Sequence, residues 1–197
     1  MKPAHEVRIV GGVWKRSKLP VADKPGLRPT PDRVRETLFN WLGQDLSGWR
    51  CLDAFAGRGA LGFEAASRGA AEVLLLEQDA DLVRSLQASR QRLQAEALRI
   101  ERTDALRWMA CAPAGAFDLV LLDPPFDTDL AARALPLAAR LAAADGLIYL
   151  ELRQALPSPP EGWSLHRQGR AGAVHFHLLR RVPRRAADGY TAAPNGL

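Results

Sequence analysis

The sequence predicts an α/β fold in which a mostly parallel β-sheet is covered by helices on both faces. Short apolar segments alternate along the chain with segments whose apolar residues recur at helical spacing. The apolar segments are nearly continuous, as expected for strands that are buried on both faces. With 197 residues, 47% of them hydrophobic and 25% charged, the chain is long enough for one domain with a substantial core.

The first expected element is a short basic β-hairpin. Apolar and polar residues alternate in 7–10 and again in 13–16, on either side of two glycines that suit a tight turn with positive φ angles. A helix is expected next, with Thr30 as its N-cap and Pro31 at its first position, because apolar residues then recur at helical spacing as far as Leu42. Residues 1–48 are therefore predicted to form an N-terminal hairpin and helix extension.

Strands and helices alternate through the rest of the chain. Strands are expected at residues 50–55, 72–77, 99–102, 117–122 and 147–152, and helices at residues 60–68, 79–97, 105–109 and 128–143. Two final strands, 164–168 and 174–181, are close enough in sequence to form an antiparallel hairpin, which completes a sheet of seven strands. Residues 49–182 are the predicted main domain, and residues 183–197, which lack a periodic apolar pattern, are predicted to be a mobile tail.

The excess of positive charge lies at the N-terminal end. The first fifty residues contain ten Lys and Arg against five Asp and Glu, whereas the rest of the chain contains seventeen of each kind. A basic lobe of this kind suggests a polyanionic partner, although a solvated face that keeps the protein soluble is the alternative. The residues predicted to face a nucleic acid are Arg8, Lys15, Arg16, Lys18, Arg28, Arg33 and Arg35.

Several classes of protein do not fit the sequence. No segment approaches the roughly 18 apolar residues of a membrane-spanning helix, and the first six residues lack the apolar core of a secretion signal. Cys51 and Cys111 are too far apart to suggest a metal site or a disulfide framework. The expectation is a cytoplasmic monomer without a metal ion or a membrane contact.

Acidic residues close the first strands of the predicted sheet, where ligands bind in open parallel sheets. Asp53 precedes a turn whose Gly57 and Gly59 let a ligand approach the backbone closely. Glu77 ends the next strand, where an acid can accept hydrogen bonds from both hydroxyls of a ribose. Asp104 follows the third strand and could accept a hydrogen bond from an adenine amino group. Each acid alone could be a helix cap, but three at the same edge favour a nucleoside cofactor.

The stretch Asp123-Pro124-Pro125-Phe126 follows the fourth strand. It would point a carboxylate and a proline carbonyl into the same crevice, since the second proline has no N–H to bond locally. Two such acceptors can hold the two hydrogens of one planar amine and direct its lone pair outward. Phe126 could stack on a base that has left its helix. The alternative for Asp123 is an N-cap before a helix that begins with proline.

These motifs resemble the class I S-adenosylmethionine-dependent methyltransferases that modify exocyclic amines. More narrowly, residues 8–12, 27–42 and 55–62 resemble the bacterial small-subunit ribosomal RNA guanine-N2 methyltransferases of the guanine 966 type. The resemblance extends from about Arg8 to Arg181. It implies a Rossmann-like class I methyltransferase fold and transfer of a methyl group from S-adenosylmethionine to guanine N2, which leaves S-adenosylhomocysteine.

The resemblance also implies roles for individual residues. The cofactor would be bound by Asp53, Phe55, Gly57, Gly59, Glu77, Gln78, Asp104 and Ala105. Asp123 and Pro124 would orient the target amine, and Phe126 would stack on the base. The implied substrate is 16S ribosomal RNA within an assembled or nearly assembled 30S subunit.

Three other functions fit part of the sequence. An adenine-N6 DNA methyltransferase would have a similar site, but the short N-terminal extension leaves little room for the usual target-recognition region. A non-catalytic RNA-binding assembly factor would have no use for the cofactor acids. An NAD-dependent oxidoreductase would be expected to carry the Gly-x-Gly-x-x-Gly fingerprint, which this chain lacks.

Overall fold

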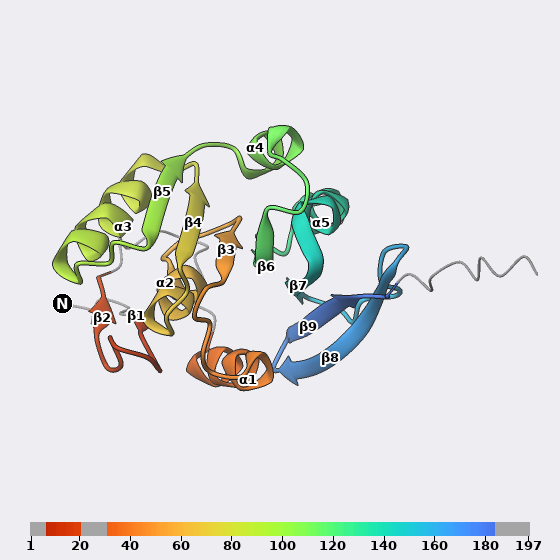
Figure 1. Ribbon diagram of the computed structural model, residues 1–197, viewed down its shortest axis with the longest axis horizontal. Helices are drawn as coiled ribbons and strands as arrows, with labels where there is room; N and C mark the ends of the chain where they lie inside the picture. Colours follow the sequence, from red (N-terminus) through yellow and green to blue (C-terminus); the bar gives the residue numbers. More distant parts are fainter. Residues whose placement is uncertain (1–6, 21–30, 184–197) are drawn as a thin grey trace, which may run out of the picture.

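The computed structural model describes residues 7–20 and 31–183, and it confirms the α/β class (Figure 1). In chain order the elements are β1 (Val7–Arg8), β2 (Lys18–Leu19), α1 (Asp32–Leu42), β3 (Arg50–Asp53), α2 (Ala60–Ser67), β4 (Glu72–Glu77), α3 (Ala80–Arg92), β5 (Leu98–Arg102), α4 (Ala105–Cys111), β6 (Phe117–Leu122), α5 (Leu130–Leu141), β7 (Ala142–Leu152), β8 (Trp163–Ala171) and β9 (Val174–Arg181). Seven of the strands form one sheet in the order β5-β4-β3-β6-β7-β9-β8, and β1 pairs with β2 in a separate small sheet.

Most strands of the large sheet are parallel, as expected. Strand β3 pairs in parallel with β4 on one side and with β6 on the other, and β5 and β7 continue the parallel arrangement outward. Strand β9 is antiparallel to both β7 and β8, which confirms the predicted C-terminal hairpin. The chain builds the sheet outward from β3 in one direction and then in the other, so the carboxyl ends of β3 and β6 border the crevice where such sheets bind ligands.

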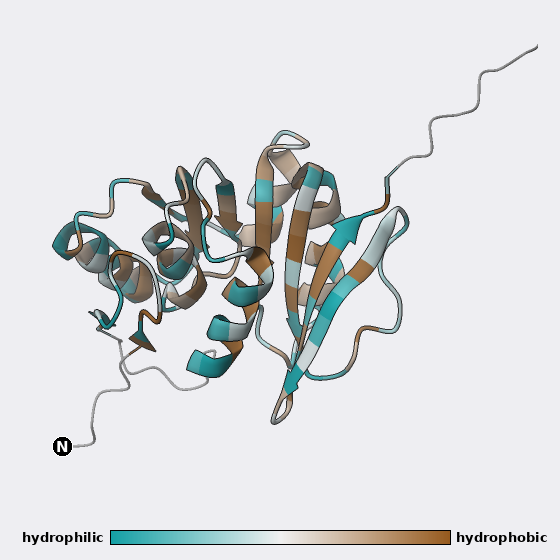
Figure 2. Ribbon diagram, turned by 60° about the horizontal axis from the view of Figure 1, so that its bottom comes forward, coloured by the Kyte–Doolittle hydropathy of each residue, from teal (hydrophilic) through white to brown (hydrophobic). Residues whose placement is uncertain are grey.

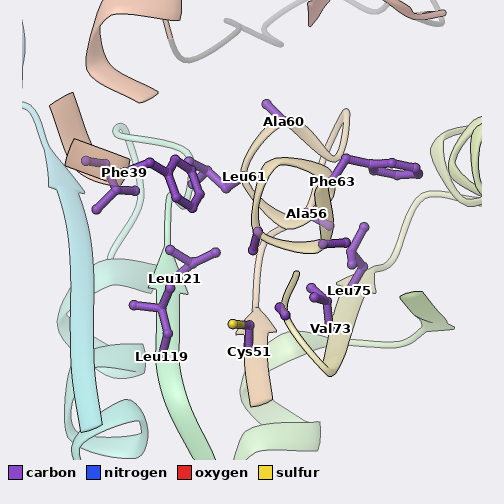
Figure 3. Close-up of a cluster of buried hydrophobic side chains, with 14 of the residues drawn as sticks. Phe39, Cys51, Ala56, Ala60, Leu61, Phe63, Val73, Leu75, Leu119 and Leu121 are labelled. Carbon is purple, nitrogen blue, oxygen red and sulfur yellow. The ribbon is translucent and has the colours of Figure 1, made fainter. Parts of the chain in front are cut away.

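Alternate residues of the central strands face two different helical layers. In β6, Leu119 and Leu121 lie in the cluster that α1, α2 and α3 cover, whereas Val120 and Leu122 lie in the cluster covered by α4 and α5. Figure 3 shows part of the first cluster, where Leu61 of α2 lies next to Phe39 of α1, above the strand side chains of Leu119 and Leu121. The central strands are largely hydrophobic and the edge strand β8 is largely exposed (Figure 2). Burial on both faces therefore explains the continuous apolar runs.

The predicted N-terminal hairpin exists, but its pairing differs from the prediction. Val7 pairs with Leu19 and Arg8 with Lys18, so the return strand is Lys18–Leu19 and not residues 13–16, which form a turn. The two glycines serve a close contact with α2. A Cβ atom on Gly12, which has a φ of 71°, would lie 1.9 Å from the carbonyl oxygen of Ser67. The Ser67 hydroxyl donates to the carbonyl of Gly11 at 2.6 Å.

Helix α1 begins one residue later than predicted. Pro31 has an extended ψ of 144° and flanks the helix, whose first residue is Asp32. The proposed N-cap, Thr30, lies outside the described residues. At the other end Gly43 adopts the left-handed conformation, with a φ of 93°, and its N–H donates to the carbonyl of Phe39. This confirms the predicted end of the helix and follows the usual role of glycine after a last turn.

Other element boundaries also differ from the predicted ones, among them those of α3, β7 and α5. Helix α3 ends at Arg92, before the predicted residue 97, and the chain reverses through Gln94, whose φ is 51°. Strand β7 begins at Ala142, before the predicted residue 147. Helix α5 begins at Leu130 and not at Thr128, which leaves a loop of residues 123–129 after β6. Apolar periodicity alone does not define these ends, because the turn residues belong to neither pattern.

A buried ionic network attaches the N-terminal extension to α2. The carboxylate of Glu64, which is fully buried, accepts hydrogen bonds from Arg68 Nη2 at 2.8 Å and from the backbone N–H of Val10 at 2.9 Å. Arg35 Nη1 lies 3.4 Å from the same carboxylate and donates to the carbonyl of Arg8 at 2.6 Å. Arg35 is only 1% exposed, so its prediction as an RNA contact was wrong. Its charge is needed inside the protein to pair with Glu64.

The extension and the sheet share one hydrophobic core. Val7, Ile9 and Leu19 are buried in the same cluster as side chains of α1, α2 and the central strands. A division of the chain at residue 48 therefore does not separate two hydrophobic cores. The predicted division into an extension and a main domain stays a prediction. Within residues 7–20 and 31–183, no helix has the length and apolar character required to cross a membrane.

We expect Glu64→Ala to lower the free energy of unfolding by about 3–5 kcal/mol, because it leaves two buried guanidinium groups without their shared carboxylate. Urea denaturation followed by circular dichroism measures this change. Glu72→Ala, at an exposed glutamate where β4 begins, is the matched control and should change stability by about 0.5 kcal/mol or less. Equal effects of the two substitutions would contradict a structural role for the network.

Candidate functional site

A cleft of about 620 Å³ lies at the carboxyl ends of the parallel strands. Residues that follow β3, β4, β5 and β6 form most of its wall, and the end of β7 contributes on one side. Pro31 at the start of α1 and Val174 at the start of β9 also line it. The cleft therefore lies where an open parallel sheet is expected to bind its ligand.

The structure brings most of the predicted site residues together in this cleft. Those that line it are Asp53, Phe55, Gly57, Glu77, Gln78, Asp104, Ala105, Asp123, Pro124 and Phe126. Gly59 is not part of the wall. A Cβ atom at Gly59 would lie 2.6 Å from Leu86 Cδ2 and 2.7 Å from Phe63 Cδ2, so this glycine allows close packing behind the cleft.

Asp53 is a buried carboxylate with an incomplete set of hydrogen bonds. Its Oδ2 accepts a hydrogen bond from the N–H of Gly62 at 2.9 Å. Its Oδ1 has no hydrogen bond of normal geometry among the described residues. The backbone amide of Phe55 nevertheless lies near enough to lower the pKa of Asp53. Burial raises the pKa of Asp53 to about 7, and the charges of Asp123 and Glu77 add to the effect. A cationic donor bound in the cleft would offset both the cost of burying the Asp53 charge and its repulsion by the neighbouring carboxylates.

Glu77 organises the glycine turn after β3. Its Oε2 accepts from the N–H of Gly57 at 2.9 Å and its Oε1 accepts from the N–H of Asp79 at 2.8 Å. A carboxylate offers about four acceptor positions, so these two bonds leave capacity for a ligand. The acid at the end of β4 therefore shapes the turn that a ligand would contact.

Asp104 caps a helix, which is the alternative role that the sequence left open. Its Oδ1 accepts from the N–H of Arg107 at 2.8 Å, so Asp104 is the N-cap of α4. The same residue also lines the cleft. A helix cap and a ligand contact do not exclude each other, because the cap uses one oxygen of the carboxylate.

Asp123 does not cap the helix that follows it. Strand β6 ends at Leu122, and α5 begins only at Leu130, with Asp129 as the residue before it. The hydroxyl of Thr128 donates to the carbonyl of Pro125 at 2.7 Å and closes the intervening loop on itself. The alternative of a helix cap for Asp123 is thereby excluded, and the carboxylate lies in the cleft wall.

Two acids of the cleft wall, Asp127 and Glu151, were not predicted from the sequence. Glu151, near the end of β7, is 2% exposed and lines the same cleft. Its Oε1 accepts a hydrogen bond from the hydroxyl of Tyr149 at 2.7 Å. Glu151 follows an apolar run as the other acids do, and this pattern is the sequence signal that could have identified it.

The basic residues of the extension lie mostly on the surface. Arg8, Lys15, Arg16, Lys18 and Arg33 are exposed, and none of them lines the cleft. Arg28 lies outside the described residues. Contact of these side chains with a nucleic acid stays a prediction. In the part of the chain that the structure describes, no group of three or more His, Cys, Asp or Glu side chains could hold a metal ion.

Comparison with known proteins identifies the family. The family model described as Conserved hypothetical protein 95 matches residues 7–180. The chain belongs to this family. A curated Escherichia coli K12 relative, named Ribosomal RNA small subunit methyltransferase D, is 42% identical over 195 residues that cover 95% of this chain and 98% of the relative.

Solved structures share the fold of this family member. The Escherichia coli protein yhhF is 39% identical, covers 90% of this chain with 98% of its own length, and gives a TM-score of 0.81. An RNA methyltransferase from Salinibacter ruber, solved in complex with S-adenosyl-L-homocysteine, is 16% identical with a TM-score of 0.61 and covers 82% of this chain and 97% of its own. At that identity the likeness concerns the fold alone. The expected class I methyltransferase fold is confirmed.

We expect the stability contributed by Asp53 to fall as the pH rises from about 4 to 7. The folded pKa of about 7 lies above the ordinary value of 3.8, so the folded state holds the proton more tightly and loses this advantage on ionisation. Asp53→Asn should remove the loss, which is worth a few kcal/mol across the window. Urea denaturation of both proteins at several pH values measures it. Parallel stability profiles would show that Asp53 ionises normally.

Proposed function

We propose that this protein transfers a methyl group from S-adenosylmethionine to the exocyclic N2 of a guanine in 16S ribosomal RNA. The observation that carries the proposal is the convergence of Asp53, Glu77 and Asp123 on one cleft, in a chain that belongs to a family with ribosomal RNA methyltransferase relatives. The cleft volume of about 620 Å³ is within the range of small-molecule sites.

The cofactor residues fit the chemistry of S-adenosylmethionine. Asp53 Oδ1, buried without a hydrogen bond of normal geometry, suits the ammonium of the amino-acid part, and the turn at Gly57 lets that part approach the backbone. Glu77 suits the ribose hydroxyls, and Asp104 with Ala105 suits the adenine. When bound, the cofactor supplies an activated methyl group on a sulfonium.

Asp123 and Pro124 hold the target amine in the proposed reaction. The lone pair of an exocyclic amine is delocalised into the base, and two acceptors on its hydrogens direct that lone pair toward the methyl group. The N2–carbon bond forms as the sulfur–carbon bond breaks, and the amine then releases a proton. Good orientation can contribute roughly 7–11 kcal/mol to such a step. The Asp123 charge also stabilises the developing positive nitrogen.

The remaining residues bind the RNA. Phe126, which is half-buried in the cleft wall, stacks on the flipped guanine. The exposed Lys15, Arg16 and Lys18 contact phosphates outside the cleft. We propose that the protein acts as a monomer in the cytoplasm on an assembled or nearly assembled 30S subunit.

Transfer of labelled methyl groups to 30S particles that lack the modification tests the proposal. We expect one methylated nucleoside, N2-methylguanosine, in the digested 16S RNA, and no transfer to duplex DNA. N6-methyladenine in DNA would support the adenine-N6 DNA methyltransferase instead. Binding to particles without transfer would support an assembly factor.

Asp123→Ala should lower turnover by orders of magnitude and leave the affinity for S-adenosylmethionine nearly unchanged, because the lost bond acts on the nucleophile. The turnover of Asp123→Asn should lie between those of the parent protein and Asp123→Ala, since the amide keeps one oxygen but no charge. Single-turnover methylation of 30S particles and calorimetric titration measure both effects. Asp129→Ala, an exposed aspartate outside the cleft, is the control. An Asp123→Ala protein with the parent rate would refute this mechanism.

Neutralising Lys15, Arg16 and Lys18 together to Gln should weaken particle binding and flatten its dependence on salt, because phosphate contacts are lost. Filter binding at several salt concentrations measures this change. A control of equal charge replaces Arg84, Arg99 and Arg133, which are exposed and form ion pairs elsewhere on the surface. Weaker binding of S-adenosylmethionine with unchanged binding of RNA would mean that the lobe serves the cofactor.

A further inference from the structure

We infer that Glu151 selects guanine by accepting a hydrogen bond from N1–H of the target base. This inference rests on the proposed function and assigns a role to a residue of the cleft wall that the methyl-transfer step leaves unexplained. It makes Glu151 a determinant of base specificity, whereas Asp123 acts on the amine that is methylated.

The sheet brings Glu151 and Asp123 to the same edge. Strands β6 and β7 are parallel, and Leu121 pairs with Tyr149 and Leu122 with Leu150. If this register is continued by one residue beyond the end of β6, Asp123 comes opposite Glu151, and neighbouring strands of a sheet lie about 4.8 Å apart. Both residues line the same cleft. Two carboxylates are thus presented side by side at one edge of the sheet.

The strand order separates Glu151 from the cofactor residues. Asp53 ends β3 and Glu77 ends β4, on one side of β6, whereas β7 lies on the other side (Figure 1). A base whose amine is held by Asp123 at the end of β6 therefore extends toward β7, away from the residues proposed to bind the cofactor. Glu151 lies on the side that the base must occupy.

Glu151 is held in place by a buried partner. The hydroxyl of Tyr149, which is fully buried, donates to Glu151 Oε1 at 2.7 Å. The pKa of Tyr149 is raised well above its ordinary value by burial and by the charges of Glu151 and Asp123, so the hydroxyl stays protonated and remains a donor. A carboxylate has about four acceptor positions, so it can accept a donor from the ligand in addition to its partners in the protein.

The edge of guanine matches this pair of acceptors. Guanine presents N1–H directly beside its C2 amine, so two neighbouring donors face two neighbouring carboxylates. Adenine presents an unprotonated N1 beside its amine, and this nitrogen would face Glu151 as a second acceptor. A buried site built to accept a hydrogen bond strongly disfavours a ligand without the donor, because polar groups are left unpaired.

The base 2-aminopurine separates the two roles, because it keeps the C2 amine and lacks N1–H. We expect the parent protein to methylate 30S particles with guanine at the target position faster than particles with 2-aminopurine there, on the order of 100-fold or more in single-turnover assays. Comparable rates on the two particles would overturn the inference, and this measurement needs no variant.

Glu151→Gln should shift the preference between the two bases. Its amide can donate to an unprotonated N1, so guanine methylation should slow while the ratio of the guanine rate to the 2-aminopurine rate falls by at least about 10-fold. Comparing ratios between proteins cancels any difference in the intrinsic reactivity of the two amines. Glu72→Gln, at the opposite end of the sheet, is the matched control and should keep the parent ratio.

Two further measurements keep the outcomes distinct. Affinity for S-adenosylmethionine should agree within about 2-fold between the parent and Glu151→Gln, because the residue contacts the base and not the cofactor. A folded variant that binds the cofactor and keeps the parent ratio would overturn the role of Glu151. A parent protein that forms no N2-methylguanosine would instead overturn the proposed function.

Discussion

The parallel pairing of β3 with β4 on one side and β6 on the other is the constraint on which the site depends. It brings the carboxyl ends of three strands to one edge, and Asp53, Glu77 and Asp123 are found there because each ends or follows one of these strands. The acids repel one another, and burial together with this repulsion raises the pKa of Asp53. The fold therefore creates an anionic cleft, and the apolar helical layers on both faces hold it together.

An anionic cleft restricts what can bind inside it. A cationic sulfonium cofactor and a base edge rich in donors complement the carboxylates, whereas a phosphate would be repelled. In the proposed function the RNA backbone stays outside, near the exposed basic residues of the extension, and only the flipped base enters. In this proposal the basic surface therefore binds the RNA backbone, and the acidic cleft binds the base.

The buried network around Glu64 connects these two parts of the protein. Arg35 approaches its carboxylate from α1 and Arg68 from directly after α2, and Val10 donates to it from the extension. Buried charges are costly to leave without a partner, so the network fixes how the extension lies against α2. The basic surface is thereby attached to the same hydrophobic core that supports the cleft.

The sequence by itself determined the fold class, the position of nearly every helix and strand, and the acids at the ends of the first four strands. Apolar periodicity is a local property that does not depend on which strands become neighbours. Only the tertiary structure decided that β1 pairs with Lys18–Leu19, that Arg35 is buried, that Gly59 serves packing and that Glu151 lines the same cleft as Asp123. Each of these depends on contacts between residues far apart in the chain, and local spacing carries no information about the partner.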